Sequence, residues 1–429
     1  MRGFRWKSAV FVLAPLILLV AGLVWGLTGT NRARQAPPPA PAIPVVTLPP
    51  AVPSTINDVS SAGLDAYIQA KMKVAHVPGL AAGVVHDGEV VWAKGFGWAD
   101  IARRRPVTPD TGFMLASISK TFIATAVMQQ VEAGNLSLSA DVGAYLPFPV
   151  RNPRHPDDPI TLYQLLTHTS SVRDHDPVWD DLYTYGHDSA MSLDSFLEGY
   201  LTPGGILWNA RDYSRFAPGR KYDYSNVGAD LAAYVVEAAT GVPFDQYCAT
   251  HVFAPLGMNT TSYKLEGLDR GALAMPYRYV SGSGKYRAYG HYSYPDYPCG
   301  QARTSVSQLG RFLASYTSGG TYHGVRLLKP ATVAEILRPQ IGALYPGQGL
   351  IWYREKVGGP KVLGHQGGDS GVCTFMFFDQ KTGDGAIVLT NSDVSTWKQW
   401  YAVEDVFAKL IAEAPRLQPG TACCARRRC

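Results

Sequence analysis

Strand-like segments occur in two groups, near the start and near the end of the main part of the chain. The first group is "LAAGVVHDG" and "EVVWAKGFGWAD", and Asp87-Gly88 is the predicted hairpin turn between them. The second group is "GLIWYR", "KVLGHQ", "GVCTFMFFD" and "GAIVLTNSD". A lone hairpin is marginally stable in water, so the early strands need the late ones as sheet partners. Residues from about 115 to 335, between the groups, are predicted to form mostly helices and loops.

Two predicted helices flank these strands. The first runs from Asp58 to about Ala75, where apolar Leu64, Ile68 and Met72 recur at four-residue intervals. The second runs from about Thr396 to Ala414. The predicted fold class is therefore α/β in the α+β sense, with an antiparallel sheet flanked by terminal helices and an inserted, mostly helical lobe. A cleft between two such lobes is a common place for a ligand site.

The chain begins with a basic and then apolar segment. Ser8 to Thr30 contains no charged residue, and a membrane-spanning helix needs about 20 apolar residues. We expect residues 1–34 to form an uncleaved membrane anchor, with a cleaved signal peptide as the alternative, although no clean A-x-A site follows. Either way, the rest of the chain would be extracytoplasmic, in the periplasm or outside the cell.

Four parts are expected along the chain. After residues 1–34 comes a proline-rich stretch, 35–54, which should act as a semi-rigid extended spacer. Residues 55–415 form the main domain, and 416–429 are predicted to be a disordered tail.

The formal net charge of +5 arises at the two ends of the chain. Residues 1–34 and 421–429 contain no acidic residue, so the part between them is net acidic. This distribution excludes a basic nucleic-acid-binding face, and no nucleic-acid partner is expected. The terminal basic residues are Arg2, Arg5, Lys7, Arg32, Arg34, Arg426, Arg427 and Arg428.

The cysteines predict neither a metal site nor a cofactor. None of the six is spaced like a zinc ligand, and no C-x-x-C pair occurs. Cys299 and Cys373 could pair in an oxidising compartment, but buried free thiols are at least as good an interpretation. The cysteines are Cys248, Cys299, Cys373, Cys423, Cys424 and Cys429.

A serine and a lysine three residues apart lie inside "FMLASISKTFIATAVMQQVEAGNL". On a helix that begins near Ser117, residues i and i+3 share one face, so Ser117 Oγ and Lys120 Nζ can meet. The free N–H groups and the positive dipole end of such a helix favour a developing oxyanion. We expect burial among apolar neighbours to lower the pKa of Lys120, so that it can accept the serine proton.

The same spacing also has an ordinary explanation. Serine is a good N-cap, lysine is common on helices, and chance supplies about one S-x-x-K match in such a chain. A second match, Ser395 to Lys398, is predicted to be the start of the last helix. Spacing alone does not choose between the two.

The surroundings of Ser117 do distinguish them. "TGFMLASISKTFIA" resembles the nucleophile motif of the serine β-lactamase and penicillin-binding-protein family, especially the class C β-lactamase-related branch with its esterases and D-aminopeptidases. The Y-x-N motif of that family is matched by Tyr224-Ser225-Asn226. "ITLYQLLTHTSSV" and "PCGQARTSVSQLGRFL" match further family stretches. Relatives usually carry glycine where this chain has Ser171, which could alter the loop near the cleft. The resemblance covers about residues 55–415.

Two stretches could supply the third family motif. Lys381-Thr382-Gly383 matches K-T-G, but it lies between two strand-like runs and is followed by Asp384-Gly385, which is typical of a hairpin turn. His365-Gln366-Gly367 lies on the preceding strand, where related esterases and peptidases often have H-x-G. Strand placement favours His365, and a glycine there lets a substrate backbone approach closely.

The resemblance implies an acyl-enzyme mechanism. Ser117 would attack a carbonyl, and Tyr224, with a phenol pKa lowered by Lys120, would take its proton and pass it to the leaving group. His168 is interpreted as structural. The implied site is catalytic Ser117, Lys120 and Tyr224, substrate-binding Asn226, His365 and Gly367, and an oxyanion hole from Ser117 and Gly368.

The implied activity is that of an extracytoplasmic serine hydrolase acting on a small-molecule or peptide substrate. Histidine in place of the family lysine removes a fixed positive charge that would hold a carboxylate, so carboxylic esters or D-amino-acid peptides and amides are favoured. A β-lactamase or DD-carboxypeptidase is the alternative. A non-catalytic, acylated sensor or wall-binding protein is the alternative of another class, although the set Ser117, Lys120, Tyr224 and Asn226 is complete.

Overall fold

The structure is a computed structural model that describes residues 45–47, 62–175 and 179–417, all within one compact unit, Ala42–Cys429. The predicted membrane segment, the first residues of the predicted first helix and most of the predicted tail lie outside these residues. Within the described ranges, no helix is both long and apolar enough to cross a membrane.

The helices and strands have the following bounds. The helices are α1 (Ala62–Ala75), α2 (Lys120–Glu132), α3 (Leu162–Leu166), α4 (Trp179–Leu182), α5 (Leu193–Leu201), α6 (Asn226–Thr240), α7 (Phe244–Cys248), α8 (Val306–Thr317), α9 (Pro330–Leu337) and α10 (Trp397–Glu413). The strands are β1 (Val45–Thr47), β2 (Gly79–His86), β3 (Glu89–Asp100), β4 (Arg105–Pro106), β5 (Phe113–Met114), β6 (Thr184–Tyr185), β7 (Tyr277–Val280), β8 (Lys285–Ala288), β9 (Tyr292–Ser293), β10 (Arg303–Thr304), β11 (Thr321–Tyr322), β12 (Val325–Arg326), β13 (Tyr353–Lys356), β14 (Lys361–Asp369), β15 (Val372–Phe378) and β16 (Gly385–Thr390).

The main sheet has seven antiparallel strands in the order β13-β14-β15-β16-β2-β3-β4. The early hairpin β2–β3 joins the late strands through β16, where Leu80 pairs with Thr390 and Val85 with Gly385. The prediction that the two groups of strands share one sheet is therefore confirmed. The helical lobe is inserted between them in the sequence, as expected.

Local sequence explains most of the strand ends, with one correction. Asp87 and Gly88 both have positive φ, 49° and 73°, as a two-residue type I′ hairpin turn requires. The strand predicted from "GLIWYR" was placed too early, because β13 begins only at Tyr353. Ile351 just before it has φ 65°, which breaks an extended strand, and its N–H donates to the Leu166 carbonyl.

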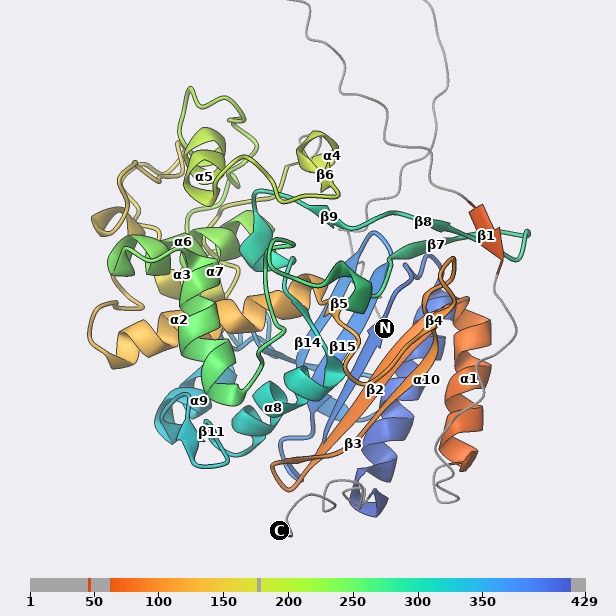
Figure 1. Ribbon diagram of the computed structural model, residues 1–429. Helices are drawn as coiled ribbons and strands as arrows, with labels where there is room; N and C mark the ends of the chain where they lie inside the picture. The colour runs from red at the N-terminus through yellow and green to blue at the C-terminus, as the bar shows by residue number, and fades with distance from the viewer. Residues whose placement is uncertain (1–44, 48–61, 176–178, 418–429) are drawn as a thin grey trace, which may run out of the picture. The chain divides into compact units, whose positions relative to one another are not determined.

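Helices cover the sheet on both faces (Figure 1). On one face α1 packs beside α10, and residues such as Ile68, Val84 and Phe407 form one apolar cluster with the sheet. On the other face α8 and the helical lobe pack against alternate strand residues such as Val85 and Ile387. The central strands are therefore buried on both sides, which fits their nearly continuous apolar sequence.

The helical lobe also carries short strands. Paired strands β5–β10, β6–β9 and β11–β12 lie within or beside it, and β7 and β8 form a sheet with β1. β1 falls inside the proline-rich stretch 35–54 that was predicted to be only a spacer. Its extended conformation fits that prediction, but Val45–Thr47 pairs with β8 as an edge strand. Edge strands tolerate nearby prolines because one side of the strand needs no partner.

Candidate active site

Ser117 lies on a strained turn between strand β5 and helix α2. Ala116 has φ 48°, a left-handed conformation that is uncommon for a residue with a side chain. Ala116–Ser119 then form one 3₁₀ turn that leads directly into α2. Side chains three residues apart eclipse on such a turn. Lys120 Nζ accordingly lies 3.1 Å from Ser117 Oγ, to which it donates a hydrogen bond.

Lys120 is fully buried and is held from two sides. Its Nζ also donates to the Cys299 carbonyl oxygen at 2.8 Å, and the Cys299 N–H donates to Asp230 Oδ1 at 2.8 Å. Burial alone lowers the pKa of Lys120, but the nearby acidic groups Tyr224, Cys299 and Asp230 outweigh it and raise that pKa. The sequence-based expectation of a lowered lysine pKa was therefore wrong. It counted the apolar neighbours but not the acids that distant segments bring in.

Tyr224 faces Lys120 and His168. Lys120 Nζ lies 5.2 Å from the centroid of the Tyr224 ring, and the His168 ring lies 4.4 Å from it. The Tyr224 hydroxyl is buried and has no hydrogen-bond partner among the described residues. Burial raises the pKa of Tyr224, and the opposing influence of Lys120 and Ser117 is too small to reverse this. The expectation of a lowered phenol pKa was thus also wrong.

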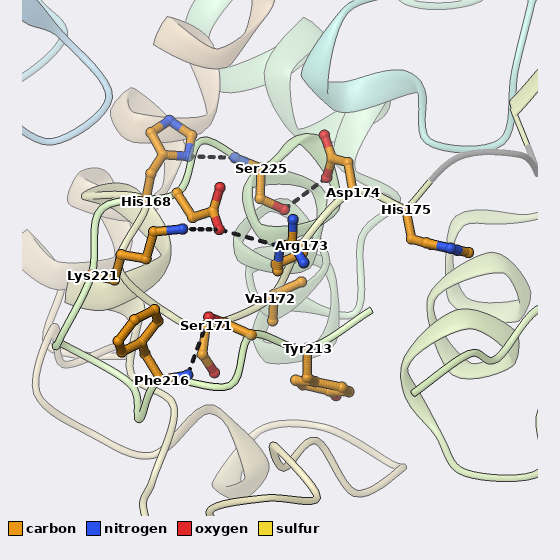
Figure 2. Close-up of polar contacts among 12 residues, drawn as sticks. His168, Ser171, Val172, Arg173, Asp174, His175, Tyr213, Phe216, Lys221 and Ser225 are labelled. Atoms are coloured by element: carbon orange, nitrogen blue, oxygen red, sulfur yellow. Dashed lines mark hydrogen bonds and ion pairs between the residues drawn. The ribbon is translucent and has the colours of Figure 1, made fainter. Parts of the chain in front are cut away.

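The segment carrying Tyr224 is fixed by an aspartate that the sequence did not single out (Figure 2). The Asp174 carboxylate accepts a hydrogen bond from Ser225 Oγ at 2.8 Å, which Figure 2 shows. It also accepts from Asn226 N at 2.8 Å and Val227 N at 3.1 Å. These are free N–H groups at the start of α6, so Asp174 caps the helix from outside. No local signal could reveal it, because Asp174 lies 51 residues before Ser225.

His168 is only partly the satisfied structural residue that was expected. The Ser225 N–H donates to His168 Nδ1 at 3.3 Å, so the other ring nitrogen carries the proton. That nitrogen, Nε2, is buried without a partner in the described part of the chain. Burial, with Lys120 and His365 nearby, holds the pKa of His168 well below its usual value. The ring is a neutral neighbour of Tyr224.

The structure shows how Ser171 is accommodated at a position where relatives usually carry glycine. It has φ 70°, a conformation that glycine adopts without strain. Its hydroxyl accepts a hydrogen bond from Asn152 Nδ2 at 3.2 Å, and Asn152 is fully buried. The loop therefore keeps the backbone geometry expected of a glycine, and its side chain gains a partner.

Strand β14 lies beside Ser117 through Gly367. A side-chain carbon on Gly367 would lie only 2.4 Å from the Leu115 carbonyl oxygen and 2.9 Å from Ser117 N. Gly368 is exposed and has open space on its side-chain position. The strand thus approaches the nucleophile turn as closely as only glycine allows. The structure brings Gly367 next to Ser117, and the oxyanion hole from Ser117 and Gly368 stays a prediction.

His365 lies on the same strand face as Gly367. Its ring is neutral, and its hydrogen bond defines which ring nitrogen carries the proton. Its Nδ1 donates to the Gln366 carbonyl oxygen at 2.6 Å, so Nε2 carries a lone pair. Nε2 is buried without a partner among the described residues, and the ring lies 6.3 Å from that of Tyr224. Burial, followed by the charge on Lys120, lowers the pKa of His365 to about 3. It therefore offers the site a hydrogen-bond acceptor, and its predicted contact with a substrate stays a prediction.

Asn226 is the first residue of α6 and is partly exposed. Across the described residues, its side-chain amide makes no hydrogen bond to Lys120 or to another group. It therefore does not orient the lysine in this structure, and its predicted contact with a substrate stays a prediction.

The two rejected motif matches lie elsewhere. Lys381 and Thr382 are exposed in the turn between β15 and β16, where Gly383 has φ 79°. Ser395 immediately precedes α10, whose N-cap Thr396 forms a capping box with Gln399. The first match therefore lies in a hairpin turn and the second at the start of a helix, as predicted from the sequence.

Acidic groups beneath Lys120 were missed by the sequence interpretation. Asp230, Asp296 and Cys299 are buried, with potential ligand atoms within 4.8 Å of one another. Burial raises the pKa of all three groups, that of Asp296 to about 7. Protonated carboxyl and thiol groups are poor metal ligands, so these raised pKa values disfavour a metal site in the cluster. Cys248, Cys299 and Cys373 are free and buried, so no Cys299–Cys373 disulfide forms.

Comparison with known proteins agrees with this geometry. A chain of the octameric penicillin-binding protein homologue from Pyrococcus abyssi has a similar structure, with a TM-score of 0.65, 25% identity, and coverage of 84% of this chain and 79% of that one. D-amino acid amidase from Ochrobactrum anthropi SV3 shares the fold at a TM-score of 0.64 and 22% identity, over 83% of this chain and 99% of the amidase.

Among curated proteins, Protein flp of Staphylococcus aureus (strain MW2) is 27% identical over 208 residues, which are 48% of this chain and 39% of that protein. The chain thus matches only about two-fifths of that relative's length. Fold and site together define a protein of the β-lactamase and transpeptidase architecture. The chain belongs to the Beta-lactamase family, whose model matches residues 64–411.

Proposed function

We propose that this protein hydrolyses carboxylic esters, or peptides and amides of D-amino acids, through an acyl-enzyme on Ser117. The observation that carries the proposal is the contact of Lys120 Nζ with Ser117 Oγ beneath the unpartnered hydroxyl of Tyr224. The amidase neighbour shows that this fold can support amide hydrolysis.

The proton of Ser117 would pass to the Lys120–Tyr224 pair. At rest both groups hold their protons, since the pKa of each is raised. Loss of one proton from the pair creates the base, which takes the serine proton during attack and returns it to the leaving group. The same pair would then activate the water that releases the acyl group.

Charge that develops on the substrate oxygen would be held by the N–H groups of Ser117 and Gly368. The close packing of Gly367 against Ser117 N supports this arrangement. Each such donor is typically worth about 3 kcal/mol in the transition state.

The substrate preference rests on His365. A neutral ring with a lone pair on Nε2 accepts hydrogen bonds and does not attract a carboxylate. β-Lactams and C-terminal peptides carry a carboxylate near the scissile bond, so they should be poorer substrates than neutral esters or amides. A cephalosporin that is turned over much faster than simple esters would contradict this preference.

We also propose that the hydrolase domain works outside the cytoplasm, tethered by residues 8–30. The uncharged, apolar sequence of that segment supports this location. Cell fractionation with protease treatment of intact cells or spheroplasts tests it. A soluble protein protected inside the cell would contradict the proposal.

The first experiment measures the intact mass of the full chain after treatment with a small fluorophosphonate. Wild type should gain one adduct, and Ser117→Ala should gain none. Ser395→Ala is the matched control, because Ser395 belongs to the other S-x-x-K match, and it should be labelled like wild type. No adduct on wild type, or an adduct on Ser117→Ala, would overturn the assignment and favour a non-catalytic binding protein.

A further inference from the structure

Asp369 ends strand β14, one residue after Gly368 of the proposed oxyanion hole. Two tyrosine hydroxyls donate to its carboxylate, Tyr183 to Oδ1 at 2.9 Å and Tyr294 to Oδ2 at 3.2 Å. The Ser370 N–H donates to Oδ1 at 2.7 Å. The carboxylate is thus held in a fixed position, although Asp369 remains partly exposed.

Three tyrosines lie beside this carboxylate, and two of them direct their hydroxyl groups at it. The Tyr183 ring lies 5.2 Å from that of Tyr292 and 5.3 Å from that of Tyr294, and the last two are 6.4 Å apart. The rings come from the segment after α4 and from strand β9 with its next residue, which are far apart in sequence. Tertiary structure alone therefore builds this group of one carboxylate and three aromatic rings, which we call the Asp369 cage.

The Asp369 cage lacks a positive partner. In the described ranges, Asp369 forms no ion pair. The buried Arg303 interacts with Asp369 electrostatically, but its terminal guanidinium nitrogens donate to the carbonyl oxygens of Tyr263, Gln301 and Tyr292. Burial raises the pKa of Asp369, and this outweighs the hydrogen bonds that lower it.

The Asp369 cage adjoins the nucleophile. Gly367, Asp369 and His365 share one face of β14, where alternate residues are spaced by about 6.6 Å, and Gly367 packs against Ser117 N. Tyr294 belongs to the same apolar cluster as Ala116, the residue before Ser117. A group bound at Asp369 would therefore lie two residues along β14 from the glycine that packs against Ser117.

We propose that the Asp369 cage is a subsite for a positively charged amine on the acyl part of the substrate. This inference rests on the proposed hydrolase function and specifies its substrate class. A carboxylate is a favourable partner for an ammonium group, because the positive charge is neutralised through charge-assisted hydrogen bonds. The phenol oxygens of Tyr183 and Tyr294 add further acceptors for its N–H groups.

The test compares two matched substrates, D-alanine 4-nitroanilide and propionic acid 4-nitroanilide, which differ only in the amino group. The ratio of their kcat/KM values should fall by about tenfold or more in Asp369→Asn, since the ammonium loses its counter-charge. Turnover of neutral 4-nitrophenyl acetate should stay within about threefold of wild type. Tyr183→Phe should lower the same ratio less, because the carboxylate remains.

Asp393→Asn is the matched control. Asp393 also accepts a tyrosine hydroxyl, from Tyr289 at 2.9 Å, but it lies beyond the end of β16 and not on β14. Asp393→Asn should leave the ratio of kcat/KM for the two nitroanilides unchanged. An unchanged ratio in Asp369→Asn, or an equal loss in Asp393→Asn, would overturn the proposal.

A measurement on wild type alone keeps the test independent of variant folding. Inhibition of 4-nitrophenyl acetate turnover by D-alaninamide and by propionamide, at a pH where the amine is charged, should give an apparent inhibition constant at least about tenfold lower for D-alaninamide. Equal affinities would overturn the subsite. Failure of the hydrolase function itself has a different signature, namely no fluorophosphonate adduct and no ester turnover by wild type.

Discussion

Lys120 Nζ and the Cys299 carbonyl oxygen lie 2.8 Å apart, although their residues are 179 positions apart in the sequence. This hydrogen bond ties the nucleophile helix to a segment that Asp230 holds from α6. The charge state of the lysine is therefore set jointly by α2, α6 and the turn around Cys299. Catalysis by such a pair of coupled groups should be visible in its pH dependence.

Hydrolysis of a neutral ester should accelerate with pH well above neutrality. Because the pKa values of Lys120 and Tyr224 are both raised, the form of the pair that has lost one proton is rare at pH 7 and grows by up to about tenfold per pH unit. The pH profile of kcat/KM, corrected with Ser117→Ala, measures this. A plateau reached below neutral pH would show that the pair already acts as a base there.

Tyr224→Phe should separate activity from stability. Loss of the hydroxyl should lower kcat/KM by about 10²–10⁴, as expected for a general acid–base group. Stability should be unchanged or rise slightly, because this buried hydroxyl has no partner in the described structure. Thermal unfolding and ester turnover give the two readouts.

Tyr213→Phe is the control for that variant. Tyr213 is more deeply buried than Tyr224, and its hydroxyl donates to the Leu201 carbonyl oxygen at 3.0 Å. Its removal should cost about 1 kcal/mol of stability and leave turnover intact. A Tyr224→Phe enzyme with wild-type turnover would rule out the proposed role of the phenol.

Gly367→Ala should lose both activity and stability. The new carbon would lie 2.4 Å from the Leu115 backbone oxygen, so the strand and the nucleophile turn must separate, at about 1–3 kcal/mol. Gly368→Ala, the neighbouring control, places its carbon in open space and should change the unfolding free energy by no more than about 0.5 kcal/mol. Urea unfolding compares the two. Equal stability losses would mean that the close approach at Gly367 is not maintained in solution.

Asp296→Asn should gain stability relative to wild type as the pH rises. The pKa of Asp296 is raised to about 7 in the folded protein from 3.8, so the folded state binds its proton more tightly than the unfolded chain. The stability that the protonated Asp296 carboxyl contributes is present in full below the pKa of this group in the unfolded chain. It is lost as the pH rises through about 7, the pKa of the same group in the folded protein. The unfolding free energy of Asp296→Asn minus that of wild type should therefore be about 1–3 kcal/mol larger at about pH 8 than at about pH 5.

The exposed Asp110→Asn variant is the control for that measurement, and it should behave alike at both pH values. If Asp296→Asn also shows the same difference from wild type at both pH values, the buried carboxyl is not the source of the pH dependence. The expectation concerns stability only, and it can be checked before any substrate is known.

Much of the framework could be predicted because it depends on neighbours along the chain. Alternating and continuous apolar runs gave β2, β3, β14, β15 and β16, and Asp87-Gly88 gave the hairpin turn. The three-residue spacing placed Ser117 beside Lys120, since one helical turn determines that contact. The strand position of His365 and the turn position of Lys381 also followed from local pattern.

The sequence by itself therefore determined which side chains could carry the chemistry, and tertiary structure decided their charges and surroundings. The pKa of Lys120, that of Tyr224 and the tautomer of His365 depend on burial and on groups brought together from distant segments. The Asp369 cage likewise exists only after β9 and β14 meet. Electrostatic interactions act through space at close range, so a pattern read along the chain could not supply them.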